Sequence, residues 1–292
     1  MLIEVKGGSV DLFDAILSRR SVRRYLDEPL DKNTLALIDD IVDHVRPLVP
    51  ENRFRVLRRD VVGGEDLIAA MGGYGRILTP PHYLVGNAIG SKWPLVDLGY
   101  RMEQIAVQMV QLGISTCFIG SLGREENVRI RFRLNRGSRF GAFLIFGRAA
   151  EGVTGRTINA VIRRASGGAN KQAVSDVFYN GSFKSAGVPP KSLAWIIDAG
   201  HAAPSANSVQ PWRFLWRDDT LYLFLRRRNR RYGSKPALQE YRYFDGGACM
   251  ANVMMAMEST DLLGDWVLLE EGQPDVPAYP AELEPLAKLR LR

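Results

Sequence analysis

DLGYRMEQIAVQMVQLGISTCF, residues 97–118, recurs later in the chain as DGGACMANVMMAMESTDLLGDW, residues 245–266. The two stretches align without a gap: Asp, Gly and Met come first, an apolar run follows, and each stretch ends on an aromatic residue. Apolar residues recur at spacings of three and four over about 15 positions, which indicates an amphipathic helix followed by a short strand. Similarity at a long period is typical of a duplicated unit. The sequence therefore predicts two related halves.

The match extends upstream of these stretches. PLDKNTLALIDDIVDHVRPLVPENRFRVLRRD (29–60) has the same pattern as VPPKSLAWIIDAGHAAPSANSVQPWRFLWRDD (188–219): a proline, a helix start, an Ile-Asp pair, a loop and an Arg-Phe strand. The polar, Gly-containing stretch SGGANKQ (166–172) is the predicted joint between the halves. We therefore expect a first half at 1–168 and a second half at 169–292.

Each half mixes helices with short strands. Apolar spacing predicts helices at 10–18, 31–45, 97–112, 124–132, 191–202 and 241–260. Strands are expected at 53–59, 82–88, 114–118, 140–147, 213–217, 220–226 and 265–269, with a hairpin turn at 217–220. This order predicts an α+β fold in which helices sandwich a sheet in each half.

Bulk composition is that of an ordinary globular chain, with 292 residues, 46% of them hydrophobic and 24% charged. No run reaches the roughly 20 apolar residues of a membrane span, and the first residues lack a signal-peptide pattern, so we expect a cytoplasmic protein without membrane contact. Cys117 and Cys249 lie far apart, and three histidines are scattered along the sequence. This spacing predicts neither a disulfide nor a metal site.

The net charge of +7 is concentrated in basic clusters at 18–25, 58–62, 161–165 and 225–233. Such clusters are usually solvated faces, and none has the interleaved aromatic residues typical of single-strand binding. We expect no nucleic-acid partner. The alternative is a nucleic-acid patch at LRRRNRRYG (225–233), which a salt-sensitive interaction with DNA or RNA would reveal.

Two segments carry residues suited to ligand binding. In SRRSVRRY (18–25), Arg19, Arg20 and Arg23 can converge on one small anion while Ser21 donates a hydroxyl hydrogen bond, which suits a phosphate monoester. In HAAPSANSVQPW (201–212), small residues allow a flat ligand to approach, and amide side chains offer donors and acceptors to a ring edge. Taken alone, the first is commonly a solvated turn and the second a loop with a helix cap.

Together, the two segments resemble the FMN-dependent nitroreductase family. The resemblance implies that RRSVR holds the flavin phosphate and ribityl chain, and that APSANSVQPW covers the isoalloxazine ring from the other unit of a dimer. A third segment, GISTCFIGS (113–121), is similar to the family's strand and loop beside the ring. The implied contacts are Arg19, Arg20, Ser21, Arg23, Ile119, Gly120, Ser121, Pro204, Ser205, Ala206, Asn207 and Gln210.

Basic residues further along the sequence are matched less closely by the resemblance. Lys171 aligns best with the basic position that closes the family's phosphate pocket, and Arg163 and Arg164 are the alternatives. Arg76, in a Gly-Tyr-Gly-Arg loop, matches a basic residue that faces the ring edge in the family.

The departures from the family pattern are complementary in the two halves. FYNGSF (178–183) stands where the arginine segment should recur, and RPLVPEN (46–52) replaces the second-half APSANSVQ. Only one complete site can therefore form per chain. This is similar to a tandem, fused subgroup of nitroreductases, an internal pseudo-dimer with one FMN, for which a monomer suffices.

The resemblance also implies the chemistry. NAD(P)H would reduce the flavin and a small-molecule acceptor would take the electrons, with no catalytic side chain required. No GxGxxG follows a strand, so NAD(P)H is expected to bind only transiently, over the flavin. The alternatives are a flavin-binding or degenerate, non-enzymatic member of the fold, and a specialised member that differs in the lid over the flavin.

Overall fold

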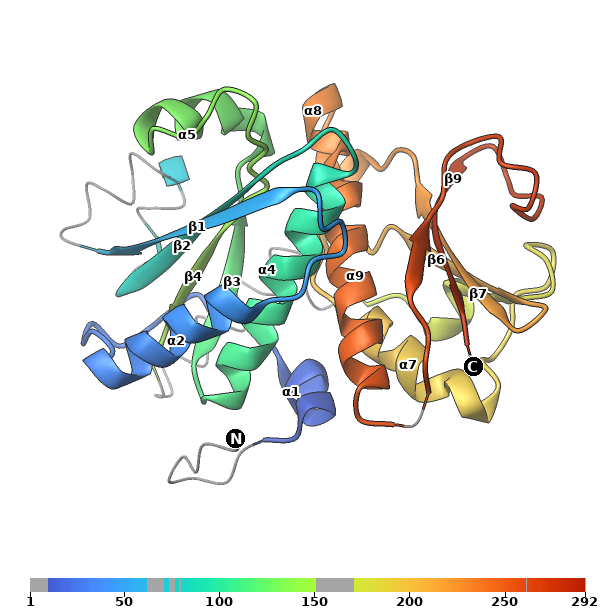
Figure 1. Cartoon of the computed structure of the whole chain (residues 1–292), viewed down its shortest axis with the longest axis horizontal. Helices are drawn as coiled ribbons and strands as arrows, with labels where there is room; N and C mark the ends of the chain where they lie inside the picture. The colour runs from blue at the N-terminus through green and yellow to red at the C-terminus, as the bar shows by residue number, and fades with distance from the viewer. Residues whose placement is uncertain are drawn as a thin grey trace.

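The chain folds into two α+β halves that meet along a pair of central helices (Figure 1). The computed structural model describes residues 10–61, 71–73, 77–78, 80–150, 171–260 and 262–291. Each half contributes one sheet, and no strand of one sheet pairs with a strand of the other in this described part.

The first half is built on a four-stranded antiparallel sheet. Its strands lie in the order β1 (Arg53–Asp60), β2 (His82–Ile89), β4 (Ala142–Gly147) and β3 (Ser115–Gly120). The central strands β2 and β4 are buried along almost their whole length, as expected for strands covered on both faces. The helices of this half are α1 (Leu12–Ser18), α2 (Lys32–His44), α4 (Pro94–Gln111) and α5 (Glu125–Arg131).

The second half repeats this order and adds one strand. β6 (Trp212–Arg217), β7 (Thr220–Arg226), β9 (Leu283–Arg290) and β8 (Trp266–Leu268) are antiparallel neighbours, and β5 (Phe178–Asn180) pairs in parallel with β6. The helices of this half are α7 (Lys191–Ala202), α8 (Pro236–Gln239) and α9 (Tyr241–Met257). Asp218 and Asp219, both with positive φ, form the hairpin turn between β6 and β7.

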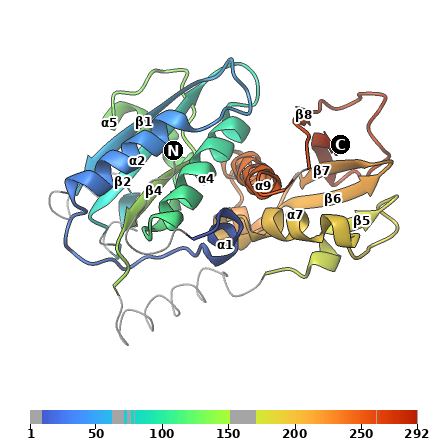
Figure 2. The same ribbon diagram turned by 60° about the horizontal axis from the view of Figure 1, so that its bottom comes forward.

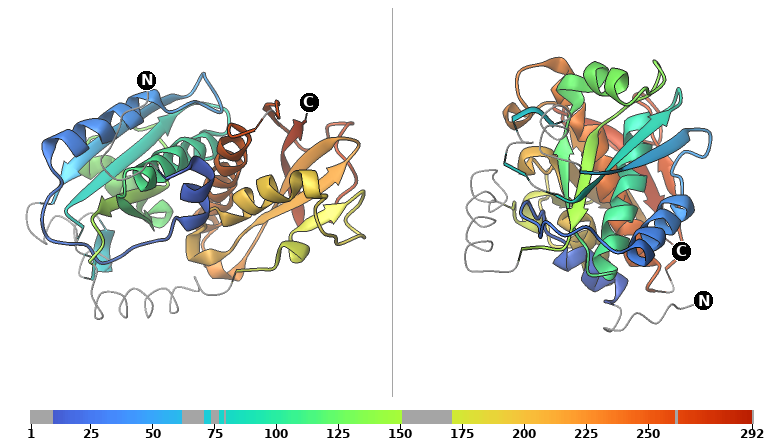
Figure 3. Two further views of the ribbon diagram at one scale, coloured as in Figure 1. Left: turned by 90° about the horizontal axis from the view of Figure 1, so that it is seen from below. Right: turned by 90° about the vertical axis from the view of Figure 1, so that its left-hand side faces the viewer.

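The two halves pack through α4 and α9, which lie side by side between the sheets (Figure 1). Glycines allow the close approach: a β-carbon at Gly99 would lie 2.0 Å from the carbonyl oxygen of Phe244, and one at Gly247 would lie 2.0 Å from that of Val96. α1 packs on α4, α7 and α9 at one end of this helix pair (Figures 2 and 3). The arginine segment that follows α1 therefore starts at the boundary between the halves.

Most of the predicted elements form close to their expected bounds. The expectation missed β5, which has three residues, and β9, because LEPLAKLR carries Pro285 and lacks strand-like alternation. The register between β7 and β9 shifts at Leu223/Phe224, beside Pro285. The joint predicted at 166–172 and the boundary at 168 lie largely outside the described residues and stay a prediction.

One detail of the repeat alignment is wrong. Residues 178–180 do not take the place of the arginine segment, because β5 pairs with β6, the counterpart of β1. Ser21 instead forms a parallel bridge to Thr116 on β3, at the opposite edge of the equivalent sheet. No helix in the described part of the chain is long and apolar enough to cross a membrane.

Candidate functional site

The arginine segment is laid out as extended chain along the edge of β3. Asp11 caps the start of α1 by accepting a hydrogen bond from the Phe13 N–H, and the helix ends at Ser18, with Arg19 at its C-cap. Ser21 then bridges Thr116, and the Val22 N–H donates to the Thr116 carbonyl at 3.0 Å. The Ser21 side chain also contacts the Cys117 thiol. These contacts hold the first predicted segment against the strand of the third.

Arg19 is buried against a carboxyl group that the sequence reasoning missed. Its Nε lies 3.2 Å from Oε1 of Glu103 on α4, and both side chains are almost completely enclosed. Burial raises the pKa of Glu103 to about 7, although the charges of Arg19 and Lys171 oppose the shift. The difference between the halves at this repeat position, Glu103 in the first and Ala251 in the second, is the sequence signal that could have identified Glu103.

Lys171 lies close enough to the arginine segment for their charges to interact. Loss of hydration lowers the pKa of Lys171, the charges of Arg19 and Arg20 lower it further, and Glu103 opposes them. Arg19 and Lys171 therefore act on the Glu103 carboxylate, and Arg20 adds a third positive charge beside Lys171. Such a concentration of positive charge favours an anionic ligand.

The second predicted segment forms a tight loop after α7. Asn207, Ser208 and Gln210 all have φ near +50°, a conformation that non-glycine residues rarely adopt and that often occurs at ligand sites. The loop is held from outside: Asp245 accepts from the Ala206 N–H at 3.1 Å, and the Asn207 side chain donates to the Arg231 carbonyl at 2.7 Å. Within the loop, the Gln210 N–H donates to Ser205 Oγ at 2.9 Å.

Gln172 connects this loop to the arginine segment. Its backbone N–H donates to Gln210 Oε1 at 3.2 Å, and its side chain donates to the Val209 and Gln210 carbonyls. Its carbonyl lies 2.9 Å from His201 Nε2. Because Lys171 precedes Gln172 and faces Arg19, residues 171–172 link the first and second predicted segments.

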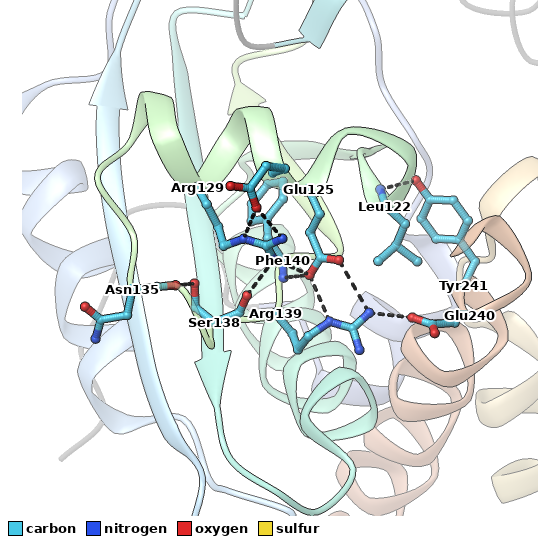
Figure 4. Close-up of polar contacts among 10 residues, drawn as sticks. Leu122, Glu125, Arg129, Asn135, Ser138, Arg139, Phe140, Glu240 and Tyr241 are labelled. Atoms are coloured by element: carbon cyan, nitrogen blue, oxygen red, sulfur yellow. Dashed lines mark hydrogen bonds and ion pairs between the residues drawn. The ribbon is translucent and has the colours of Figure 1, made fainter. Parts of the chain in front are cut away.

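The third predicted segment, at the end of β3, is covered by the start of α9. Tyr241 Oη accepts from the Leu122 N–H at 2.9 Å (Figure 4). Gly120 leaves the space that this phenol ring occupies. Beside it, Arg139 contacts both Glu125 of its own half and Glu240 of the other (Figure 4). Ile119 is buried in the sheet core, and Ser121 is buried just beyond the strand.

Asp245 and two tyrosines join the third segment to the second. Tyr232 donates from its hydroxyl to Asp245 Oδ2 at 2.7 Å, and its ring lies 6.1 Å from that of Tyr241. Burial raises the pKa of Asp245 to about 7 against these hydrogen bonds. No local sequence pattern predicts a role in the site for Asp245, Tyr232 or Tyr241, although Asp245 and Asp97 match in the repeat. Contacts thus join the first predicted segment to the third and the third to the second, while the second is linked to the first through the charge of Lys171.

Hydrogen-bonding capacity left unmet in the described structure is concentrated in this region. Seven buried side-chain nitrogen and oxygen atoms have no hydrogen-bond partner there, and six of them belong to Arg19, Glu103, Thr116 and Ser121. Buried polar groups are nearly always paired, so these atoms are available to a polar ligand. Guanidinium donors and hydroxyls beside a cationic cluster fit the phosphate and polar chain of FMN.

The equivalent loop of the first half is closed by a side chain. Asp97 accepts from the Leu48 and Val49 N–H groups at 2.9 and 3.0 Å, much as Asp245 does from Ala206. Arg101, however, fills this loop: its guanidinium pairs with Asp97 and donates to the Val49 and Asn52 carbonyls. Cys249 occupies the matching position in the second half. The two loops therefore differ in whether an arginine of the central helix fills them, and one site per chain stays a prediction.

Three predicted residues lie outside the described part of the chain: Arg76, Arg163 and Arg164. A hollow is present elsewhere, at the far end of the second sheet. It is lined by Trp216, Asp219, Leu262, Asp265, Val267, Lys288, Arg290 and Leu291, and shares no residue with the candidate site.

The fold and the site together define the nitroreductase class of α+β proteins. A family model described as "Putative TM nitroreductase" matches residues 11–232, and the chain belongs to this family of oxidoreductases. A crystal structure of a "putative nitroreductase" from Thermotoga maritima has a TM-score of 0.58 at 16% identity, and the match covers 99% of this chain and 97% of that one. This likeness shows that the fold is shared along the whole length.

Two further solved structures match about half of this chain. An FMN-dependent nitroreductase from Clostridium difficile is 19% identical, over 47% of this chain and 87% of its own, with a TM-score of 0.40. NfrA1 from Bacillus megaterium is 18% identical, over 48% of this chain and 68% of its own, with a TM-score of 0.42. No curated protein matches the sequence.

Proposed function

We propose that the chain is an FMN-dependent oxidoreductase in which NAD(P)H reduces the flavin and a small acceptor receives the electrons. The observation that carries this proposal is the set of buried polar atoms without a hydrogen-bond partner on Arg19 of the first predicted segment and on Thr116 and Ser121 of the third. Bound FMN supplies the redox chemistry, and the protein supplies binding and orientation.

The residues divide into two groups by what they offer a flavin. Cations and a hydroxyl would hold the phosphate: Arg19, Arg20, Ser21, Arg23 and Lys171. Backbone and small or amide side chains would lie along the ring: Ile119, Gly120, Ser121, Pro204, Ser205, Ala206, Asn207 and Gln210. Since both groups come from one chain and Arg101 closes the counterpart loop, we infer one flavin per chain and a functional monomer.

The first test is the visible absorption spectrum of the purified protein, with released chromophore quantified per chain and compared with FMN. One FMN per chain, followed by NAD(P)H oxidation with an added acceptor, would support the proposal. Bound FMN without reduction by either nicotinamide would favour a non-enzymatic flavin-binding protein. Two FMN per chain would contradict the one-site assembly, and no binding of added FMN would contradict the proposal itself.

A further inference from the structure

The Arg19–Glu103 pair is an unusual way to build an anion site. Arg19 is a donor for a phosphate, yet its nearest described partner is a carboxyl group with the same sign of charge as that phosphate. Neither Nε nor Nη1 of Arg19, and neither oxygen of Glu103, has a hydrogen bond with acceptable geometry among the described residues. An ionised carboxylate kept in this way, fully buried and without hydrogen bonds, is costly.

The surroundings of Glu103 offer little other compensation. In the described part of the chain, the charges that act on it are those of Arg19, which follows α1, and Lys171, which precedes α7. One turn away on α4, Gly99 and Val107 are uncharged, and α9 has Ala251 at the equivalent repeat position. Arg20 acts on Lys171 and Lys171 acts on His201, but neither Arg20 nor His201 acts on Glu103. Of the two equivalent repeat positions, only the one in the half with the arginine segment has a carboxyl group.

Arg19 cannot serve an ionised Glu103 and a phosphate equally well. A phosphate monoester carries close to two negative charges at neutral pH, and a second anion within a few ångströms strongly favours protonation of a carboxyl group. With Glu103 ionised, Arg19, Arg20 and Lys171 give a local charge of about +2. With Glu103 protonated, the three cations and Glu103 together carry a charge of about +3, and Arg19 is free to bind the ligand.

We propose that Glu103 takes up a proton from solvent when a phosphate monoester binds at Arg19, so that retention of the ligand by this chain is coupled to proton uptake. This inference rests on the proposed function, with the flavin phosphate as the monoester. The pKa of Glu103, which burial raises to about 7, allows this exchange close to neutral pH. Glu103 is then a positioning residue: it holds Arg19 in place until the anion arrives.

The test uses flavin-free full-length protein and two probes, FMN and riboflavin, which lacks the phosphate. Affinities are measured by flavin fluorescence between about pH 7 and pH 9, where the phosphate, with its second pKa of about 6, no longer titrates. We expect FMN affinity to fall by up to about tenfold per pH unit, because binding must then protonate Glu103. Riboflavin affinity should not change with pH.

Two variants distinguish the titration of Glu103 from that of Lys171. Glu103→Gln should remove most of the pH dependence for FMN. Lys171→Arg should keep it, because a guanidinium does not titrate in this range whereas a lysine of lowered pKa could cause a similar slope. A slope that persists in Glu103→Gln, or vanishes in Lys171→Arg, would overturn the assignment to Glu103.

Calorimetry on the wild-type chain provides a test that needs no Glu103 variant. FMN is titrated at about pH 7.5 in two buffers of different ionisation enthalpy, and the difference in heat gives the protons exchanged. Because Glu103 is already about one quarter protonated at this pH, full coupling gives a net uptake of about three quarters of a proton. Uptake of this size, retained in Lys171→Arg, supports the proposal, and no uptake contradicts it. If the wild-type chain binds riboflavin as tightly as FMN, the flavin site exists but does not bind the phosphate, which contradicts this proposal. Failure to bind either flavin would instead contradict the proposed function.

Discussion

Gly99 on α4 packs directly against the backbone carbonyl of Phe244 on α9. Gly247 makes the matching contact with Val96, so that the two contacts are related by the 148-residue offset between Asp97 and Asp245. A contact that is made in both directions is the property of an isologous, two-fold interface. The halves of this chain therefore meet as the subunits of a symmetric dimer would.

This relationship predicts the cost of adding one methyl group at the interface. Gly99→Ala and Gly247→Ala would each place a β-carbon 2.0 Å from a carbonyl oxygen, and the helices would have to separate. We expect each change to lower the free energy of unfolding by about 1–3 kcal/mol. Urea denaturation measures this loss. Gly137→Ala is the control, because no atom lies within 4 Å of a β-carbon there.

The sequence predicted the fold well where its signals were local or repeated. Apolar spacing located α2, α4, α7 and α9, and the repeat predicted the close match between the sheets. β9 was missed because its pairing depends on β7 and β8, which are distant in sequence, and because Pro285 is unusual in a strand.

The candidate site was predictable in part for the same reasons. The three binding segments have recognisable local patterns, whereas Glu103 and Tyr232 contribute through contacts with residues 84 and 13 positions away, Arg19 and Asp245 respectively. A buried carboxyl on an amphipathic helix has no local sequence signature. Arg19 reaches Glu103 only because α1 packs on α4, and this packing is visible only in the structure.

Arg23 provides a direct test of the phosphate site. Arg23→Ala should weaken FMN binding by about 1.5–3 kcal/mol, the usual value of a hydrogen bond to a charged group. Riboflavin binding should change much less. Equilibrium titration of flavin-free protein measures both. Arg24→Ala is a matched control, since it removes the same charge from the adjacent position, and an equal loss in both variants would point to general electrostatics.

Asn207 tests whether the second half contributes to the same site. Its side chain holds the loop by donating to the Arg231 carbonyl, and its backbone has φ of 51°. Asn207→Ala should reduce flavin affinity several-fold, because both the amide and the tolerance for this conformation are lost. Asn207→Gly restores the tolerance without the amide and separates the two effects. Unchanged flavin spectra and affinity in both variants would exclude this loop from the site.

Asp245 predicts a pH dependence of stability. Burial raises its pKa from 3.8 to about 7, so between these values the folded chain keeps a proton that the unfolded chain has lost. Unfolding then releases a proton, and stability should fall as the pH rises from about 4 to about 7. Glu103, whose pKa is also raised, contributes with the same sign. Above about pH 7 this contribution should level off.

Asp245→Asn isolates the contribution of this one carboxyl. Its amide oxygen can still accept from the Ala206 N–H, and Tyr232 can rotate its hydroxyl to accept from the new amide, so the loop contacts are largely kept. The decline in unfolding free energy between about pH 4 and pH 7 should become shallower, as urea denaturation at a series of pH values would show. Asp219→Asn, at an exposed turn, should follow the wild-type curve. A parallel curve for Asp245→Asn would mean that the buried carboxyl titrates normally, and that its hydrogen bonds to Ala206 and Tyr232 offset its burial.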